Sequence, residues 1–311
     1  MVFTLFELHV GAHAKTGTIN FGQTTASTDV NSVEDQAESS AYADDQFVAG
    51  TLYFTRAGST VSTATWMQGR YARVVDYDAS SGQFVLSTVG FTTVSTGATT
   101  GLIPAGTEYG IATPEFNLQL MNRLSNAAVR MLGPLVYTDR SMRSSGTQTV
   151  YQLPAAATRG KPFRIDIQGR VGSSADDPSW TKLHGWHIEP STEGIGPNVV
   201  FPRSLPQGRD IRIFYEADHQ DLIASTQIID GRLHPELVTL ALVEKMYEYR
   251  NSRARGAQDF DVQRWNDAKR QLSEARIRWP VDRPKKSPTI TVVGQTATTP
   301  GIQVPPYGIL D

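Results

Sequence analysis

The chain contains no cysteine, and this absence removes two kinds of architecture. Without cysteine no disulfide framework can form, and thiolate metal sites are excluded. Charged residues are also sparse, at 19% of the sequence, while hydrophobic residues make up 39%. With 311 residues, the chain is long enough to bury a substantial core, in one large domain or in two ordinary ones.

Membrane spans and export signals are not indicated either. No apolar run approaches the roughly 20 residues that a transmembrane helix requires. Residues 1–7 have no basic segment, and Glu7 interrupts their short apolar stretch. We therefore expect a chain that folds in the cytoplasm and has no membrane partner.

Catalytic motifs are the third absence. The sequence has no G-x-S-x-G elbow, no H-E-x-x-H pair and no G-x-G-x-x-G loop. The best cluster of titratable groups is His184 and His187 with nearby Asp176 and Asp177, but histidines three apart on a strand point to opposite faces. A second group, His219 with its acidic neighbours, is typical of a polar turn. We therefore predict a protein that is not an enzyme, with no catalytic residues, no metal site and no cofactor.

The distribution of charge is uneven although the formal net charge is only −2. Residues 1–113 hold more than twice as many acidic as basic residues, whereas residues 232–286 hold 13 basic and 8 acidic ones. A chain of this polarity can meet partners, or copies of itself, in a preferred orientation. Two independently solvated surfaces would give the same pattern.

Residues 1–112 are predicted to form a β-rich N-terminal domain. Alternating apolar residues indicate strands at 50–55, 71–75 and 83–87, and the polar, glycine-ended segment 78–82 predicts a hairpin turn. The acidic spacing in this turn resembles a calcium loop, but the glycine is misplaced for one. The first 50 residues are less regular, with a short strand suggested around residues 3–10.

Residues 113–279 are predicted to form an α+β body. A helix begins at residues 113–115, where a threonine cap, a proline and a carboxylate follow one another, and its apolar stripe runs from Leu118 to Leu135. Strands are predicted at 149–154, 163–168, 182–188 and 210–215. The proline- and glycine-rich segment 189–207 is predicted to be a loop.

The body ends in a helical hairpin at residues 233–279. The first helix begins at Pro235, the second begins at Asp259, and Pro280 ends it. Because the first helix carries two apolar stripes, we predict that one of them packs against a neighbouring subunit. The side chains predicted to form this intersubunit interface are Leu237, Leu240, Tyr247, Tyr249, Trp265 and Leu272. The polar faces of the hairpin are basic.

Residues 280–311 are predicted to form an extended C-terminal arm. Its last 23 residues carry one charged side chain, and prolines keep the segment extended. Such an arm can add a strand to a neighbouring protein. The residues predicted to bind that partner are Ile290, Val292, Val293, Ile302, Val304 and Tyr307.

A series of segments in this order resembles a known family. They are residues 77–84 (YDASSGQF), 103–109 (IPAGTEY), 126–128 (NAA), 151–154 (YQLP), 163–165 (FRI), a strand containing tryptophan, 212–215 (RIFY) and 233–237 (LHPEL). Together they resemble the adaptor, or head-to-tail connector (neck), proteins of tailed bacteriophages. The resemblance covers about residues 70–280.

The resemblance implies a structural virion protein at the head–tail junction, assembled in the host cytoplasm. It implies a ring, commonly of twelve subunits, that binds the portal protein and a tail or nozzle protein, with viral DNA passing through its lumen. Three alternatives remain. They are a tail-tube or tail-terminator subunit, a receptor- or carbohydrate-binding tail module that uses Trp66, Trp180 and Trp186, and an enzyme of unfamiliar type.

Overall fold

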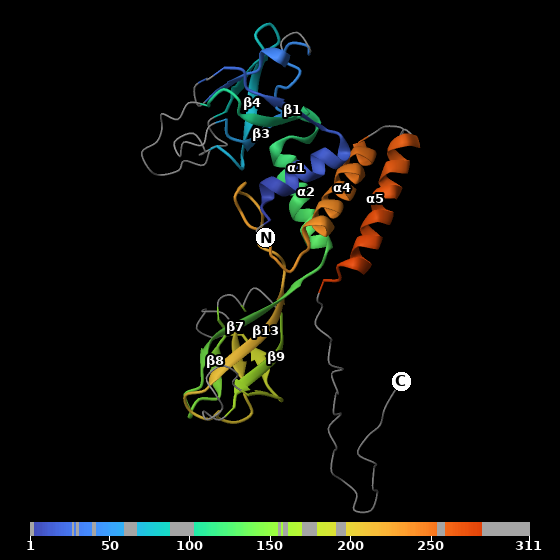
Figure 1. Ribbon diagram of the computed structural model, residues 1–311. Coiled ribbons are helices and arrows are strands. Elements are labelled where there is room, and N and C mark those ends of the chain that lie inside the picture. Colours follow the sequence, from blue (N-terminus) through green and yellow to red (C-terminus); the bar gives the residue numbers. More distant parts are fainter. Residues whose placement is uncertain are drawn as a thin grey trace, which may run out of the picture.

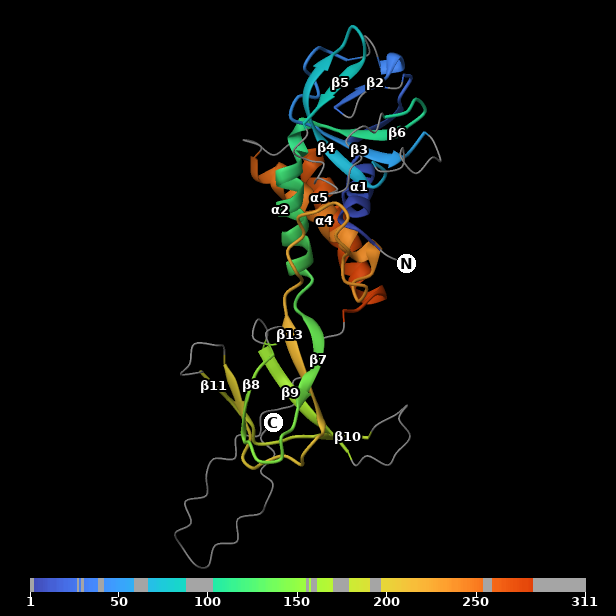
Figure 2. The ribbon, with the colours of Figure 1, turned by 90° about the vertical axis from the view of Figure 1, so that its left-hand side faces the viewer.

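The computed structural model of the chain is an α+β protein with antiparallel sheets. It describes residues 3–26, 28, 31–38, 42–58, 67–87, 103–154, 157, 161–169, 179–190, 197–253 and 259–281. Three parts follow one another in space: an N-terminal β-unit, a helical bundle and a distal β-unit (Figure 1). The view turned by 90° shows the same line of three parts (Figure 2).

The N-terminal β-unit contains a six-stranded sheet with the strand order β1-β6-β3-β4-β5-β2. Its strands are β1 (Ile19–Gln23), β2 (Ser32–Glu34), β3 (Thr51–Arg56), β4 (Arg70–Asp78), β5 (Gln83–Leu86) and β6 (Glu108–Ala112). The three strands predicted between residues 50 and 87 are confirmed. Their alternating side chains form a core that includes Leu52, Phe54, Tyr77 and Phe84.

The turn between β4 and β5 has a local cause. The Asp78 carboxylate accepts hydrogen bonds from the Ser80 amide (2.8 Å) and from the Ser81 hydroxyl (2.9 Å). Gly82 then adopts a φ of 68°, a conformation that favours glycine. The predicted hairpin turn is confirmed, and the Asp78 oxygens are used inside the turn.

The first helix, α1 (Leu5–Thr16), replaces the strand suggested near residue 3, and that prediction is wrong. Thr4 and Glu7 form a capping box, because the Glu7 amide donates to the Thr4 hydroxyl (3.3 Å) and the Thr4 amide donates to the Glu7 carboxylate (2.8 Å). Gly17 ends the helix in the left-handed conformation. The T-x-x-E spacing was a readable start signal.

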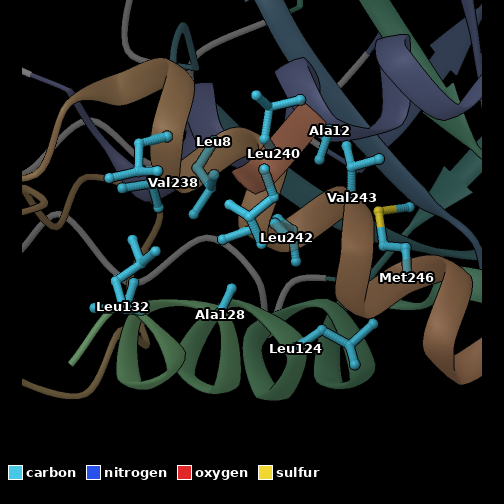
Figure 3. Close-up of a cluster of buried hydrophobic side chains, with 14 of the residues drawn as sticks. Leu8, Ala12, Leu124, Ala128, Leu132, Val238, Leu240, Leu242, Val243 and Met246 are labelled. Carbon is cyan, nitrogen blue, oxygen red and sulfur yellow. The ribbon is translucent and has the colours of Figure 1, made fainter. Parts of the chain in front are cut away.

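The helical bundle consists of α1, α2 (Leu118–Met131), α4 (Pro235–Arg253) and α5 (Asp259–Arg278). Figure 3 shows side chains of α1, α2 and α4 converging in its core. α4 contacts all three other helices. The core therefore draws on residues 5–16 as well as on residues after 113, and it packs across the predicted boundary at residue 112.

The start of α2 and the extent of its apolar stripe differ from the prediction, whereas the helix ends before Gly133 and Pro134, which were expected to end or kink it. Residues Pro114–Phe116 form a short 3-10 turn, and the α-helix begins at Leu118 because the Asn117 side chain caps it by accepting from the Leu120 amide (3.0 Å). Gly133, with a φ of 98°, then separates the helix from strand β7 (Leu135–Arg143). Leu135 is therefore a strand residue and not the end of the helical stripe.

The distal β-unit consists of two small sheets that enclose one core. The strand order is β10-β9-β13-β7 in the first sheet and β11-β12-β8 in the second. The strands are β8 (Val150–Gln152), β9 (Lys161–Gln168), β10 (Trp180–Lys182), β11 (His187–Glu189), β12 (Asn198–Val200) and β13 (Asp210–Ala217). β7 and β13 link this unit to the bundle (Figure 2). Strands predicted at 149–154, 163–168 and 210–215 are confirmed.

Two predictions in this unit are wrong in part. Residues 182–188 do not form one strand: β10 and β11 lie in different sheets, and Gly185 turns the chain between them with a φ of 71°. Segment 189–207 is not all loop, because β12 pairs with both β8 and β11. Short strands of three residues carry too little alternation to be predicted.

Candidate interaction surfaces

Four of the six predicted interface residues lie in the core of the chain's own bundle. Leu237, Leu240 and Tyr247 of α4, with Leu272 of α5, are each at most 7% exposed. The reason is that α1, α2 and α5 surround α4, so both of its apolar stripes are used inside one subunit. This corrects the interpretation that one stripe needs a neighbouring subunit.

The other two predicted residues, Tyr249 and Trp265, are partly buried at the edge of the same core. The Trp265 indole N–H donates to the buried Glu244 carboxylate (3.1 Å), and the Lys269 ammonium lies 3.3 Å from the centre of the Trp265 ring. Tyr249 packs against Phe116, with 6.1 Å between the ring centres. Both rings therefore also support contacts within the chain.

The outer face of α5 is basic and exposed. Ala268, Leu272 and Ala275 face the core. The cationic side chains on its other faces are Arg264, Lys269, Arg270, Arg276 and Arg278. Ile277, at 83% exposed, lies beside them. α5 lies on the outside of the bundle (Figure 1). Its exposed faces carry these cations beside Asp267 and Glu274, and Asp267 pairs with Arg270 at 3.2 Å.

A second cationic surface lies on the four-stranded sheet of the distal β-unit, and the sequence prediction missed it. Asp166 of β9 is fully buried between the guanidinium groups of Arg164 and Arg212, at 2.8 Å from each. Burial alone would raise the pKa of Asp166, but the hydrogen bonds from both arginines outweigh it and the pKa is lowered. The carboxylate is therefore ionised and holds both arginines in place.

Aromatic rings surround these two arginines. The Arg212 guanidinium carbon lies 4.2 Å from the centre of the Trp180 ring and 5.1 Å from that of Phe214, and the Arg164 carbon lies 5.0 Å from the Phe214 ring. Arg140 of β7 reaches the Trp180 ring at 5.8 Å. We call this set, Arg140, Arg164, Asp166, Trp180, Arg212 and Phe214, the arginine–aromatic face.

One signal in the sequence pointed to this face. In 163–168 the prediction placed Phe163, Ile165 and Ile167 on one side, which leaves Arg164 and Asp166 on the other. Ile165 and Ile167 are buried as predicted. Phe163 instead contacts Phe214, with 6.4 Å between the ring centres, at the point where the register between β9 and β13 shifts.

A polar cluster is buried where α1 meets the N-terminal sheet. His9 and His13 are both 0% exposed, and burial lowers the pKa of each to about 3. His9 Nε2 lies 3.0 Å from the Ser125 hydroxyl, and His13 Nδ1 lies 2.7 Å from the Thr18 hydroxyl. In the described part of the chain, His9 Nδ1 has no hydrogen-bond partner. Both imidazoles are therefore neutral structural groups.

The three histidines considered for catalysis have different surroundings and do not share a site. His184 is exposed in the turn before Gly185, and exposed His187 pairs with Glu189 (2.7 Å). His219 is buried, and its Nε2 accepts from the Asp230 amide (2.9 Å), which ties the segment after β13 to the segment before α4. The polar turn predicted here is not formed, because Glu216 belongs to β13 and residues 218–221 are irregular. Among the described residues, no three histidine or acidic side chains are grouped as a metal site would require.

The N-terminal β-unit carries exposed acidic residues on its outer loops. Partial desolvation and the charges of Asp44 and Asp76 raise the pKa of Asp45. This unit is therefore the acidic counterpart of the basic surfaces described above. None of the helices described is long and apolar enough to cross a bilayer.

The predicted arm lies outside the described residues from residue 282 onward, and so do its candidate partner-binding side chains, Ile290, Val292, Val293, Ile302, Val304 and Tyr307. No protein-family model matches the chain, and no curated protein matches it either. Its function is therefore inferred from its own residues and contacts.

Proposed function

We propose that this chain is a structural subunit of a tailed-bacteriophage virion that forms a ring joining the portal of the head to the tail. In this role it binds copies of itself, the portal protein and a tail or nozzle protein. Viral DNA passes through the ring without sequence-specific contacts. The starting point is the order of segments between residues 70 and 280 that resembles connector proteins.

The observation that supports this role most is the arrangement of the chain as three parts in line (Figures 1 and 2). A connector subunit meets one component above, another below and copies of itself at the sides. A helical bundle with a β-unit at each end offers separate surfaces for these contacts. Head-to-tail contacts between identical subunits close into a ring when the rotation between them permits it.

The outer face of α5 suits a lateral contact with an acidic surface. Its cations project from a helix that is anchored to α4 by Ala268, Leu272 and Ala275. A channel through which DNA slides gains nothing from a tight grip on phosphates. We therefore assign these cations to protein docking and expect weak, sequence-independent and salt-sensitive DNA binding.

The alternatives have less support. A tail-tube or tail-terminator subunit would not need the helical hairpin. A carbohydrate-binding module would use open aromatic rings, but Arg212 stacks on Trp180 and Trp186 packs against the distal core. Trp66 lies outside the described residues.

The test is to locate the chain in particles of the phage that encodes it. Immunogold labelling with an antibody to the chain should mark the single vertex where head and tail join, and quantitative mass spectrometry should give one ring of copies per particle. Label along the tail would indicate a tube subunit, and label at fibre tips would indicate a receptor-binding module. Absence from purified particles would refute the proposal.

A further inference from the structure

The arginine–aromatic face lies on the solvent side of a sheet whose other side is core. Ile165 and Ile167 of β9 pack with Ile211 and Ile213 of β13 against the three-stranded sheet. Neighbouring residues on a strand point to opposite sides, so Arg164, Asp166 and Arg212 face away from this core. Arg212 lies directly opposite Asp166 in the pairing of β13 with β9.

Asp166 engages the same edge of both arginines. Arg164 donates from Nε (2.8 Å) and Nη2 (2.9 Å), and Arg212 donates from Nε (3.0 Å) and Nη2 (2.8 Å). Within the described residues, Nη1 of each guanidinium has no acceptor. Side-chain exposure is 44% for Arg164, 18% for Arg212 and 0% for Asp166. Two donor groups are therefore held in fixed directions at a partly exposed surface.

The aromatic rings make this arrangement rigid. Stacking on Trp180 and Phe214 limits the rotamers of both arginines. A side chain that is already ordered loses less conformational entropy when a partner binds, so its contacts contribute more to affinity. Arginine and tryptophan are also the residue types that supply most of the binding energy in protein interfaces.

We propose that the arginine–aromatic face docks a partner protein that presents carboxylates at alternate positions of an extended strand. Arg164 and Arg212 are diagonal neighbours on adjacent strands, and the Cα atoms of such neighbours are about 7–8 Å apart. Carboxylates two residues apart on a strand are separated by about 7 Å. Each can therefore reach one guanidinium, while Arg140 supplies a further positive charge at the edge.

Charge decides between a protein and a nucleic acid as the occupant. The negative charge of Asp166 cancels one of the two positive charges of Arg164 and Arg212. The face therefore has a modest net charge, but its hydrogen-bond donors point in fixed directions. Binding to a phosphate backbone depends on many uncompensated cations and on counterion release. Pairing with carboxylates depends on the fixed fork of the guanidinium. This inference concerns the distal β-unit and does not depend on the connector role.

The experiment uses the full chain and a capped, fluorescein-labelled peptide with glutamate at every second position and threonine between. A peptide with glutamine in place of glutamate is the neutral control, and a labelled DNA duplex tests the other class of polyanion. Binding is measured by fluorescence anisotropy at 50 and 200 mM salt. The variant R164K/R212K keeps both positive charges but removes the planar guanidinium groups, which can donate two parallel hydrogen bonds to one carboxylate. The variant R73Q/R123Q removes two exposed charges elsewhere and is the matched control.

We expect the glutamate peptide to bind, and its Kd to rise at least tenfold in R164K/R212K but less than twofold in R73Q/R123Q. R140Q, which leaves the Asp166 pairs intact, should raise the Kd about threefold, and it keeps the test open if the double variant does not fold. Equal binding by R164K/R212K, tighter binding of DNA than of the peptide, or no peptide binding would each overturn the proposal. Self-association that R164K/R212K abolishes would identify a second copy of the chain as the partner.

Discussion

Acidification should destabilise this protein through two buried histidines. His9 and His13 are neutral in the fold, with the pKa of each lowered by burial to about 3. In the unfolded chain the same imidazoles titrate near pH 6.5. Between these values the unfolded state binds more protons than the folded state, so stability falls as the pH falls from about 6.5 towards 3.

The size of this effect follows from the difference in protonation. One pKa unit corresponds to about 1.4 kcal/mol, so at pH 5.0, about 1.5 units below the unfolded pKa, each histidine costs roughly 2 kcal/mol. The two together lower the free energy of unfolding by about 4 kcal/mol between pH 7.5 and pH 5.0. That is a large fraction of the stability of an ordinary domain, about 5–15 kcal/mol.

The assay is urea denaturation followed by far-UV circular dichroism at pH 7.5, 6.0 and 5.0. His9→Gln and His13→Gln keep a polar side chain but do not titrate in this range. Each variant should lose about half of the pH dependence, whatever its stability at pH 7.5. Ile277→Ala, at a position 83% exposed and without a titratable group, is the control and should leave the pH dependence unchanged.

Two results would refute this reasoning. A wild-type chain equally stable at pH 7.5 and 5.0 would show that the imidazoles are protonated or solvated in the fold. A pH dependence that survives in the double variant H9Q/H13Q would show that other groups cause it. Either result would also question the packing of α1 against β3, where the His13 ring centre lies 5.6 Å from that of Tyr53.

Three further predictions concern the bundle. Thr4→Ala removes the cap of α1 and should cost about 1 kcal/mol in the same urea assay; an unchanged midpoint would show that the cap is dispensable. Leu242→Ala, fully buried in α4, should cost roughly 2–5 kcal/mol, whereas Ile277→Ala, 83% exposed, should change stability by less than about 0.5 kcal/mol. Trp265→Phe removes the donor to buried Glu244 and should cost roughly 1–3 kcal/mol in thermal melts, and a melting temperature equal to that of the wild type would contradict this.

Local signals in the sequence determined much of the secondary structure. The hairpin turn after Asp78, the helix start at Pro235 and the alternation in β9 and β13 each depend on neighbours a few residues apart. Such patterns are visible in the sequence because the same residues cause the structure. The capping box of α1 belongs to this class as well, and the alternating apolar residues beside it led to the wrong prediction of a strand.

The use of each apolar face was decided by the tertiary structure. Two apolar stripes on α4 predict a helix that packs on more than one side, but not whether the second partner is another subunit or another helix of the chain. The structure assigns both stripes to α1, α2 and α5. α1 lies more than 200 residues before α4 in the sequence, so no local pattern could predict the contact between the two helices.

The arginine–aromatic face shows the same limit. Arg164 and Asp166 are two residues apart on one strand, and their position on the polar side of β9 is readable from the sequence. Arg212 and Trp180 join them through strand pairing, and that pairing decides that Asp166 is buried and ionised. Burial and charge at this site depend on residues brought together from three strands, because desolvation is a property of the packed surroundings and not of a segment.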